Sequence, residues 1–92
     1  MIVRYRAQAL ADIKEIDTFL RERSPTGASN VLRSIYAGIG TIGEWPLANP
    51  RTGSPDIRVK IETRYRYKIF YRIDGDSVVI LHVRHRSRRP WL

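Results

Sequence analysis

The spacing of apolar residues changes along this chain, and that change limits the folds it can adopt. Through residues 7–22 and again through 25–43, apolar side chains recur at three- and four-residue intervals, which is the period of an amphipathic helix. Residues 2–5 and the stretch from 57 to 85 instead alternate or form β-branched series, as strands do. This order predicts β-α-α-β-β-β, a single α+β domain over residues 1–92, with a helical hairpin packed on one face of a small antiparallel-rich sheet.

The two predicted helices differ in their signals. The first has its apolar stripe at Leu10, Ile13, Ile16, Phe19 and Leu20. The second begins with Ser24 as N-cap and Pro25 at its first position. Its buried face is predicted to consist of Ala28, Val31, Leu32, Ile35, Ile39 and Ile42. Three glycines near its end predict an end that is either frayed or tightly packed.

A proline-rich stretch at 44–56 predicts an irregular loop, in which we expect Trp45 and Leu47 to fold back over the edge of the core. Strands are predicted at 57–62, 65–73 and 77–85, with a tight turn at 74–76 between the last two.

Alternation along these strands predicts two unlike faces, provided that the last turn holds three residues. A turn of two residues would slip the register by one. With three, the helix-facing side contains Ile57, Val59, Ile61, Tyr67, Ile69, Tyr71, Ile73, Val79, Leu81 and Val83. The outward side then gathers the basic residues Arg58, Lys60, Arg66, Lys68, Arg72, His82 and Arg84, together with Phe70, Val78 and Ile80. We interpret this outward side as a basic face left for a partner.

The net charge supports an anionic partner. Residues 1–50 carry six cations and five acids, a net of +1, whereas residues 51–92 carry eleven cations and four acids, a net of +7. Such asymmetry bears on partners more than on fold, and nucleic acid and an acidic protein surface both fit it. From the residues alone, we favour nucleic acid slightly over an acidic protein surface as the partner.

Other classes of site find little support in the sequence. There is no cysteine, which excludes a disulfide scaffold and a thiolate zinc site and fits a reducing compartment. His82 and His85, three apart on a strand, should face opposite ways, so we expect neither a metal site nor a cofactor. Without a signal-peptide or membrane-spanning run, we expect a soluble, cytoplasmic protein with no membrane partner.

The chain contains "ALADIKEIDTFLRERSP", then a second predicted helix ending near "EWP", then "YRYKIFYRIDGDSVVILHVRHRSRRPW". This ordered combination resembles the ParE/RelE superfamily of bacterial toxins from toxin–antitoxin pairs. The resemblance covers nearly the whole chain. It implies a RelE/ParE-like fold and a cytoplasmic toxin of the plasmid-stabilisation type. It also implies a hetero-oligomer with an acidic, ParD-like antitoxin, for which we expect Phe19, Tyr36 and Trp45 to be contacts.

The two branches of this superfamily imply different targets. The RelE branch cuts mRNA on the ribosome, and its cation pattern matches Arg58, Lys60, Lys68 and Arg86. The usual late tyrosine is missing, because "RRPWL" ends the chain and Trp91 cannot take a proton. The ParE branch inhibits DNA gyrase by binding, without chemistry, and we favour it. The alternatives are the ribosome-dependent endoribonuclease and a degenerate, non-toxic antitoxin-binding module.

If the chain is a gyrase-binding toxin of the ParE branch, we expect no catalytic residue. The residues predicted to contact gyrase or a gyrase–DNA complex are Arg58, Lys60, Arg66, Lys68, Arg84, Arg86, Arg88, Arg89 and Trp91.

Overall fold

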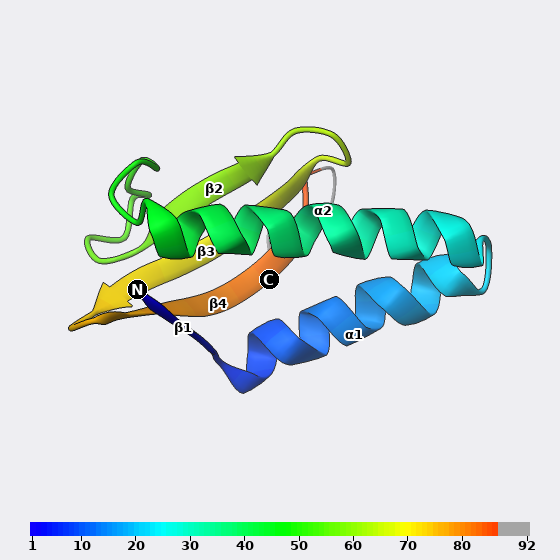
Figure 1. Ribbon diagram of the computed structural model, residues 1–92, viewed down its shortest axis with the longest axis horizontal. Coiled ribbons are helices and arrows are strands. Elements are labelled where there is room, and N and C mark those ends of the chain that lie inside the picture. Colours follow the sequence, from blue (N-terminus) through cyan, green and yellow to red (C-terminus); the bar gives the residue numbers. More distant parts are fainter. Residues whose placement is uncertain (87–92) are drawn as a thin grey trace.

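The computed structural model describes residues 1–86, and its elements follow the predicted order (Figure 1). They are β1 (Ile2–Tyr5), α1 (Ala7–Arg21), α2 (Pro25–Glu44), β2 (Arg58–Glu62), β3 (Tyr67–Asp74) and β4 (Ser77–His85). The strand order in the sheet is β1-β4-β3-β2; β1 runs parallel to β4, and the other neighbours are antiparallel. The α+β fold class is therefore confirmed.

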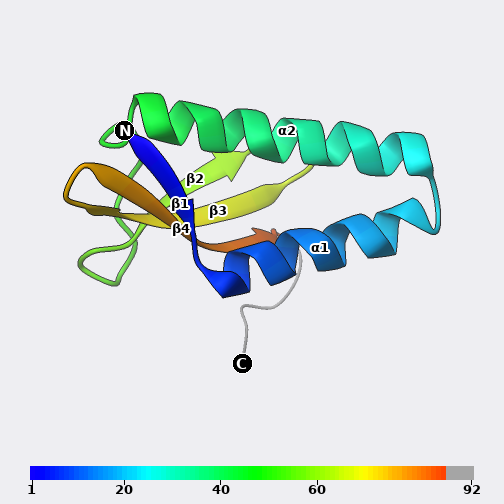
Figure 2. The ribbon, with the colours of Figure 1, turned by 60° about the horizontal axis from the view of Figure 1, so that its bottom comes forward.

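The helices form a second layer on one side of the sheet (Figures 1 and 2). Helix α2 contacts all four strands, whereas α1 packs against α2 and β4. Because α1 lies at the β4 side of the sheet, its buried stripe is narrow, comprising Ala9, Asp12, Ile13 and Ile16. Leu10 and Phe19 belong to the predicted apolar stripe but are 51% and 44% exposed, so they lie outside this buried part.

Helix α2 begins as its sequence predicts. The hydroxyl of Ser24 accepts the N–H of Gly27 at 3.0 Å, and Pro25 opens the helix. At the other end the helix continues to Glu44. Its glycines there allow the side chains of the sheet to approach the helix backbone closely. A Cβ on Gly38 would lie 3.2 Å from Cδ1 of Ile69, and one on Gly43 would lie 3.0 Å from Cγ2 of Val3. Of the two predicted outcomes, the structure has the tightly packed end.

The loop after α2 is anchored by a tyrosine rather than by its own apolar residues. The Tyr71 hydroxyl donates to the carbonyl of Pro46 at 2.6 Å and accepts from Nδ2 of Asn49 at 3.3 Å. Trp45 and Leu47 are 66% and 71% exposed, so the expectation that they cover the core edge is wrong.

The hairpin between β3 and β4 turns on two residues, Gly75 and Asp76, because Asp74 pairs with Ser77. Gly75 has φ +60°, a conformation that glycine adopts without strain. The register therefore slips by one relative to the three-residue expectation. On β4 the core then receives Val78 and Ile80 in place of the predicted Val79 and Leu81.

A β-bulge further along β4 restores the predicted face at Val83. Phe70 pairs with His82 and Tyr71 with Ile80, so Leu81 is the extra residue. Beyond the bulge Val83 joins the core, as predicted.

Strand β2 also presents the opposite face from the one predicted. Its register pairs Lys60 with Ile69 and Arg58 with Tyr71, and directly opposed side chains share a face. Arg58 and Lys60 therefore lie on the helix side, and Val59 and Ile61 lie outward with Lys68 and Phe70. The physical reason is the turn at 63–66, which sets Glu62 opposite Tyr67.

Both cations of β2 are accommodated by their long side chains. The Lys60 stem passes Gly38 of α2, its Cε lying 3.6 Å from where a Cβ on that glycine would be. The Arg58 Nη1 donates to the carbonyl of Asn49 at 2.7 Å.

Candidate functional site

The strand register divides the predicted basic face into two groups. Arg58 and Lys60 lie on the helix side of the sheet, whereas Lys68 and Arg84 oppose each other on the outward side. The prediction of a single basic face is therefore wrong. It also follows that the four cations matched to the RelE pattern do not converge on one side of the sheet.

Four cations gather where β3 begins and β4 ends, and we call them the terminal cation cluster: Arg66, Lys68, Arg84 and Arg86. The backbone N–H of Arg86 donates to the carbonyl of Arg66 at 2.6 Å, which extends the β3–β4 pairing by one step. Arg66 and Arg86 are both exposed and line a shallow pocket with Ile61, Glu62 and Thr63. In the β3–β4 pairing, Arg66 and Arg86 lie two steps beyond the opposed pair Lys68 and Arg84.

Arg66 has an uncommon backbone conformation for its type. Its φ is +66°, in the left-handed region that non-glycine residues seldom occupy. The turn around it is held by Glu62, whose carboxylate accepts the N–H groups of Arg64 and Tyr65, each at 2.9 Å. The fold thus holds the backbone of Arg66 in this conformation at some cost in strain, while its side chain is exposed.

Glu62 is buried, at 6% exposure, and also accepts the Ser34 hydroxyl at 2.7 Å. Burial alone would raise the pKa of this carboxyl. The hydrogen bonds from Ser34 and from the backbone N–H groups of Tyr65, Tyr67 and Arg64 outweigh burial, and they hold its pKa below the ordinary value.

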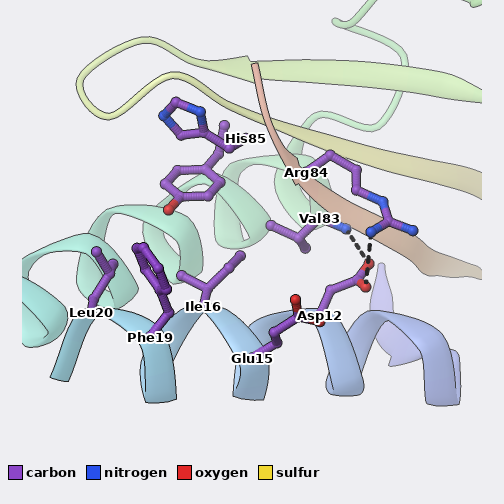
Figure 3. A pocket seen from close by; sticks show the side chains of 9 residues that line it. Asp12, Glu15, Ile16, Phe19, Leu20, Val83, Arg84 and His85 are labelled. Atoms are coloured by element: carbon purple, nitrogen blue, oxygen red, sulfur yellow. Dashed lines mark hydrogen bonds and ion pairs between the residues drawn. The ribbon is translucent and has the colours of Figure 1, made fainter. Parts of the chain in front are cut away.

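A second buried carboxylate, Asp12, joins α1 to β4 (Figure 3). Strand β1 ends at Tyr5, so it does not pair with the edge of β4 beyond Ile80. Asp12 accepts the N–H of Val83 on that edge at 3.0 Å and Nε2 of Gln8 at 2.9 Å. It also forms an ion pair with Arg84, with Nη1 to Oδ1 at 3.6 Å. This pairing orients one member of the terminal cation cluster.

Sequence reasoning missed Asp12, although a signal was present. An acid that lies three residues after Ala9 and four before Ile16 falls on the buried stripe of the helix. A charged group there requires a partner.

Next to Asp12, a pocket of about 240 Å³ opens between α1 and the ends of β3 and β4 (Figure 3). Its lining is mainly apolar and includes Asp12, Glu15, Ile16, Phe19, Leu20, Tyr67, Val83, Arg84 and His85. The Tyr67 and His85 rings meet edge to face, with centroids 5.0 Å apart. His82 is paired with Phe70 on the outward side, so the two histidines face opposite ways, as predicted.

The three predicted antitoxin contacts are all exposed but do not form one patch. Phe19 lies at the end of α1, whereas Trp45 follows the far end of α2 in the antiparallel hairpin, and Tyr36 lies between them on α2. Phe19 also lies beneath Arg23, whose Cζ is 3.7 Å from the ring centroid.

Three predicted target contacts, Arg88, Arg89 and Trp91, lie outside the described residues. Across residues 1–86, no three His, Cys, Asp or Glu side chains are grouped so as to hold a metal ion. In the same part of the chain, no helix combines the length and apolar character that crossing a bilayer requires.

Comparisons with known proteins agree on one fold. A chain of the chromosomal ParDE toxin–antitoxin system of P. aeruginosa superposes with a TM-score of 0.72 at 18% identity, covering 92% of this chain and 95% of that one. The isolated RelE toxin of E. coli gives 0.66 at 17% identity, covering 96% and 86%. A chain of the E. coli RelBE toxin–antitoxin complex gives 0.66 at 18%, covering 95% and 98%.

The sequence comparisons distinguish between the ParE and RelE families. Comparison with curated protein sequences gave no match. The sequence model of one family, the ParE toxin of the type II toxin–antitoxin system parDE, matches residues 3–90. The chain therefore belongs to the ParE toxin family of type II toxin–antitoxin systems.

Proposed function

We propose that this toxin inhibits DNA gyrase by binding to it or to its complex with DNA, without catalysing a reaction itself. The observation that carries the proposal is the match to the ParE toxin family over residues 3–90.

The arrangement of cations supports a binding role. Phosphoryl-transfer catalysis by cations requires several of them to converge where charge develops in the transition state. Here Arg58 and Lys60 lie on the helix side of the sheet and Lys68 lies on the other. Trp91 also occupies the place where the RelE pattern has its late tyrosine.

We further propose an acidic antitoxin as the physiological partner, with the hetero-oligomer residing in the cytoplasm. The structural relatives include members of a ParDE system and of a RelBE toxin–antitoxin complex, which supports this pairing. Exposed Phe19, Tyr36 and Trp45 would supply apolar contacts along the helical layer. The +8 net charge would accelerate the encounter at low salt.

A supercoiling assay with purified gyrase tests the target. We expect saturating toxin to block supercoiling and to trap cleaved DNA, and pre-incubation with an acidic antitoxin to prevent both effects. Uninhibited supercoiling without trapped cleavage would overturn the proposal.

Primer extension on translated mRNA separates this function from ribosome-dependent cleavage. We expect no codon-linked cuts after toxin expression. If cuts appear and are lost in Lys60→Ala plus Arg86→Ala, the toxin is a nuclease of the RelE type. Normal growth under strong induction of folded protein would instead identify a non-toxic binding module.

A further inference from the structure

The outward face of the sheet has an uneven distribution of charge. Its acids, Asp56 and Asp74, lie toward the turn end of β3, next to Arg72. At the opposite end of that strand lies the terminal cation cluster. Within residues 1–86, Arg66, Lys68 and Arg86 form no ion pair, and Arg84 is paired to the buried Asp12. Glu62, which lines the same shallow pocket as Arg66 and Arg86, directs its carboxylate to Ser34 and the turn backbone.

This grouping of cations is unfavourable in isolation. Lys68 and Arg84 are directly opposed across β3 and β4, where like charges repel at a Cβ separation of about 5 Å, and Asp12 pairs with Arg84 but not with Lys68. The N–H of Arg86 meets the carbonyl of Arg66, which brings a second pair of like charges together. An anion with several charges at regular spacing would relieve both repulsions.

We infer that the terminal cation cluster is a binding site for the phosphate backbone of duplex DNA. Cations two residues apart on a strand are separated by about 7 Å, and adjacent strands by about 5 Å, so the cluster forms a small grid of positive charge. Each DNA strand presents a phosphate about every 3.4 Å along the helix axis, which gives such a grid several partners at once. Three of the four side chains are arginines, whose planar guanidinium matches phosphate geometry.

An acidic protein fits this surface less well. The core of a protein–protein interface is depleted in charge and needs a buried apolar centre. Beside the cluster, the outward apolar side chains are Ile61, at 39% exposure, and the half-buried Val59. Farther along the same face, Phe70, Leu81 and Ile57 line a hollow, and of these Leu81 is buried. They offer little area for an apolar anchor. The contacts are with phosphates and not with base edges, so binding should be independent of DNA sequence.

This inference rests on the proposed function for its biological setting, because gyrase presents DNA beside its own surface. Binding of the toxin to DNA can nevertheless be measured without gyrase. The probe is a short fluorescent DNA duplex, and the readout is anisotropy at salt concentrations from about 50 to about 200 mM.

The test variant is Arg66→Asn plus Arg86→Gln. Asparagine tolerates the left-handed backbone of Arg66, and Arg86 is exposed at the end of the described chain. The matched control, Lys14→Gln plus Arg51→Gln, removes the same charge at exposed positions on α1 and at the far end of β2. We expect the test variant to bind about tenfold more weakly, with a salt slope smaller by about 2, while the control keeps the wild-type slope.

Several results would overturn the inference. These are no DNA binding by the wild-type protein, equal losses in the test and control variants, or displacement of the duplex by polyglutamate as effective as by unlabelled DNA. If the double variant fails to fold, Arg86→Gln alone should lower the slope by about 1, and an unchanged slope would contradict the inference.

Supercoiling assays on the same proteins separate this inference from the proposed function. Wild-type protein that binds DNA through the cluster but leaves gyrase active overturns the proposed function and leaves the DNA site standing. A test variant that inhibits gyrase and binds DNA as well as the wild type overturns the DNA site and leaves gyrase inhibition standing.

Discussion

Two buried carboxylates, Asp12 and Glu62, show how single residues position the charged surface of this toxin. Each accepts backbone N–H groups that the sheet or a turn leaves without a partner, and each is next to a cation of the outward face. Buried acids of this kind stabilise a fold when their hydrogen bonds are complete. Their loss should therefore reduce stability before it affects partner binding.

Replacing Asp12 with alanine should lower the free energy of unfolding by about 2–3 kcal/mol, because the N–H of Val83 loses a charged acceptor inside the protein. The control is Asp17→Ala in the same helix, which removes an exposed ion pair with Arg21. We expect it to cost less than about 1 kcal/mol. Urea unfolding of both variants measures the difference, and equal costs would contradict the role given to Asp12.

Glu62→Gln should destabilise the protein in a pH-dependent way. The folded-state pKa of Glu62 is held below its ordinary value of 4.5, so the unfolded chain binds its proton more tightly. The stabilisation is therefore complete above about pH 4.5 and is lost as the pH falls through the folded pKa. Denaturant unfolding at neutral and acidic pH should show a large difference between wild type and variant that shrinks in acid. A difference that is constant with pH would refute this account.

At the scale of elements, α2 combines weak helix formers with close packing. Its glycines at 38 and 43 lie against β3 and β1, whereas a Cβ at Gly40 would meet nothing within 4 Å. The same residue type therefore has two roles in one helix. At the packed positions it allows close approach, and at the open position its cost is entropic.

Alanine substitutions should separate these roles. Gly43→Ala places a Cβ 3.0 Å from Val3 and should destabilise the protein by about 1–3 kcal/mol. Gly40→Ala has open space and should stabilise it by about 0.5–1 kcal/mol. Thermal unfolding of the pair gives the sign of each effect directly. Stabilisation by Gly43→Ala would show that the helix end is less tightly packed than described.

For the whole molecule, periodicity was enough to predict the number, order and approximate limits of the elements. Periodicity did not predict which side chains of each strand point toward the helices. It depends on a two-residue turn at Gly75, a bulge at Leu81 and a turn held by Glu62, none of which changes the alternation of residue types. The first two set which residues of β4 face the helices, and the turn held by Glu62 places Arg58 and Lys60 on the side opposite to the one expected.

For the site, the sequence predicted which kind of residue is abundant but not how those residues are grouped in space. The excess of cations in the second half was visible in the sequence, and Lys68 and Arg84 do share the outward face. Their grouping with Arg66 and Arg86, apart from the two cations of β2, follows from pairing geometry. Asp12 was missed because an acid within an amphipathic helix is ordinarily solvent-facing.

The parallel pairing of the first strand with the last has a consequence for how the toxin is made. Ile2 pairs with Ser77 and Tyr5 with Ile80, so β1 finds its neighbour only after most of the chain has been synthesised. During translation the helical hairpin can form early from local contacts, but the sheet cannot close over it until β4 has left the ribosome. A newly made chain thus passes through a period in which the apolar faces of its two helices have no sheet to pack against.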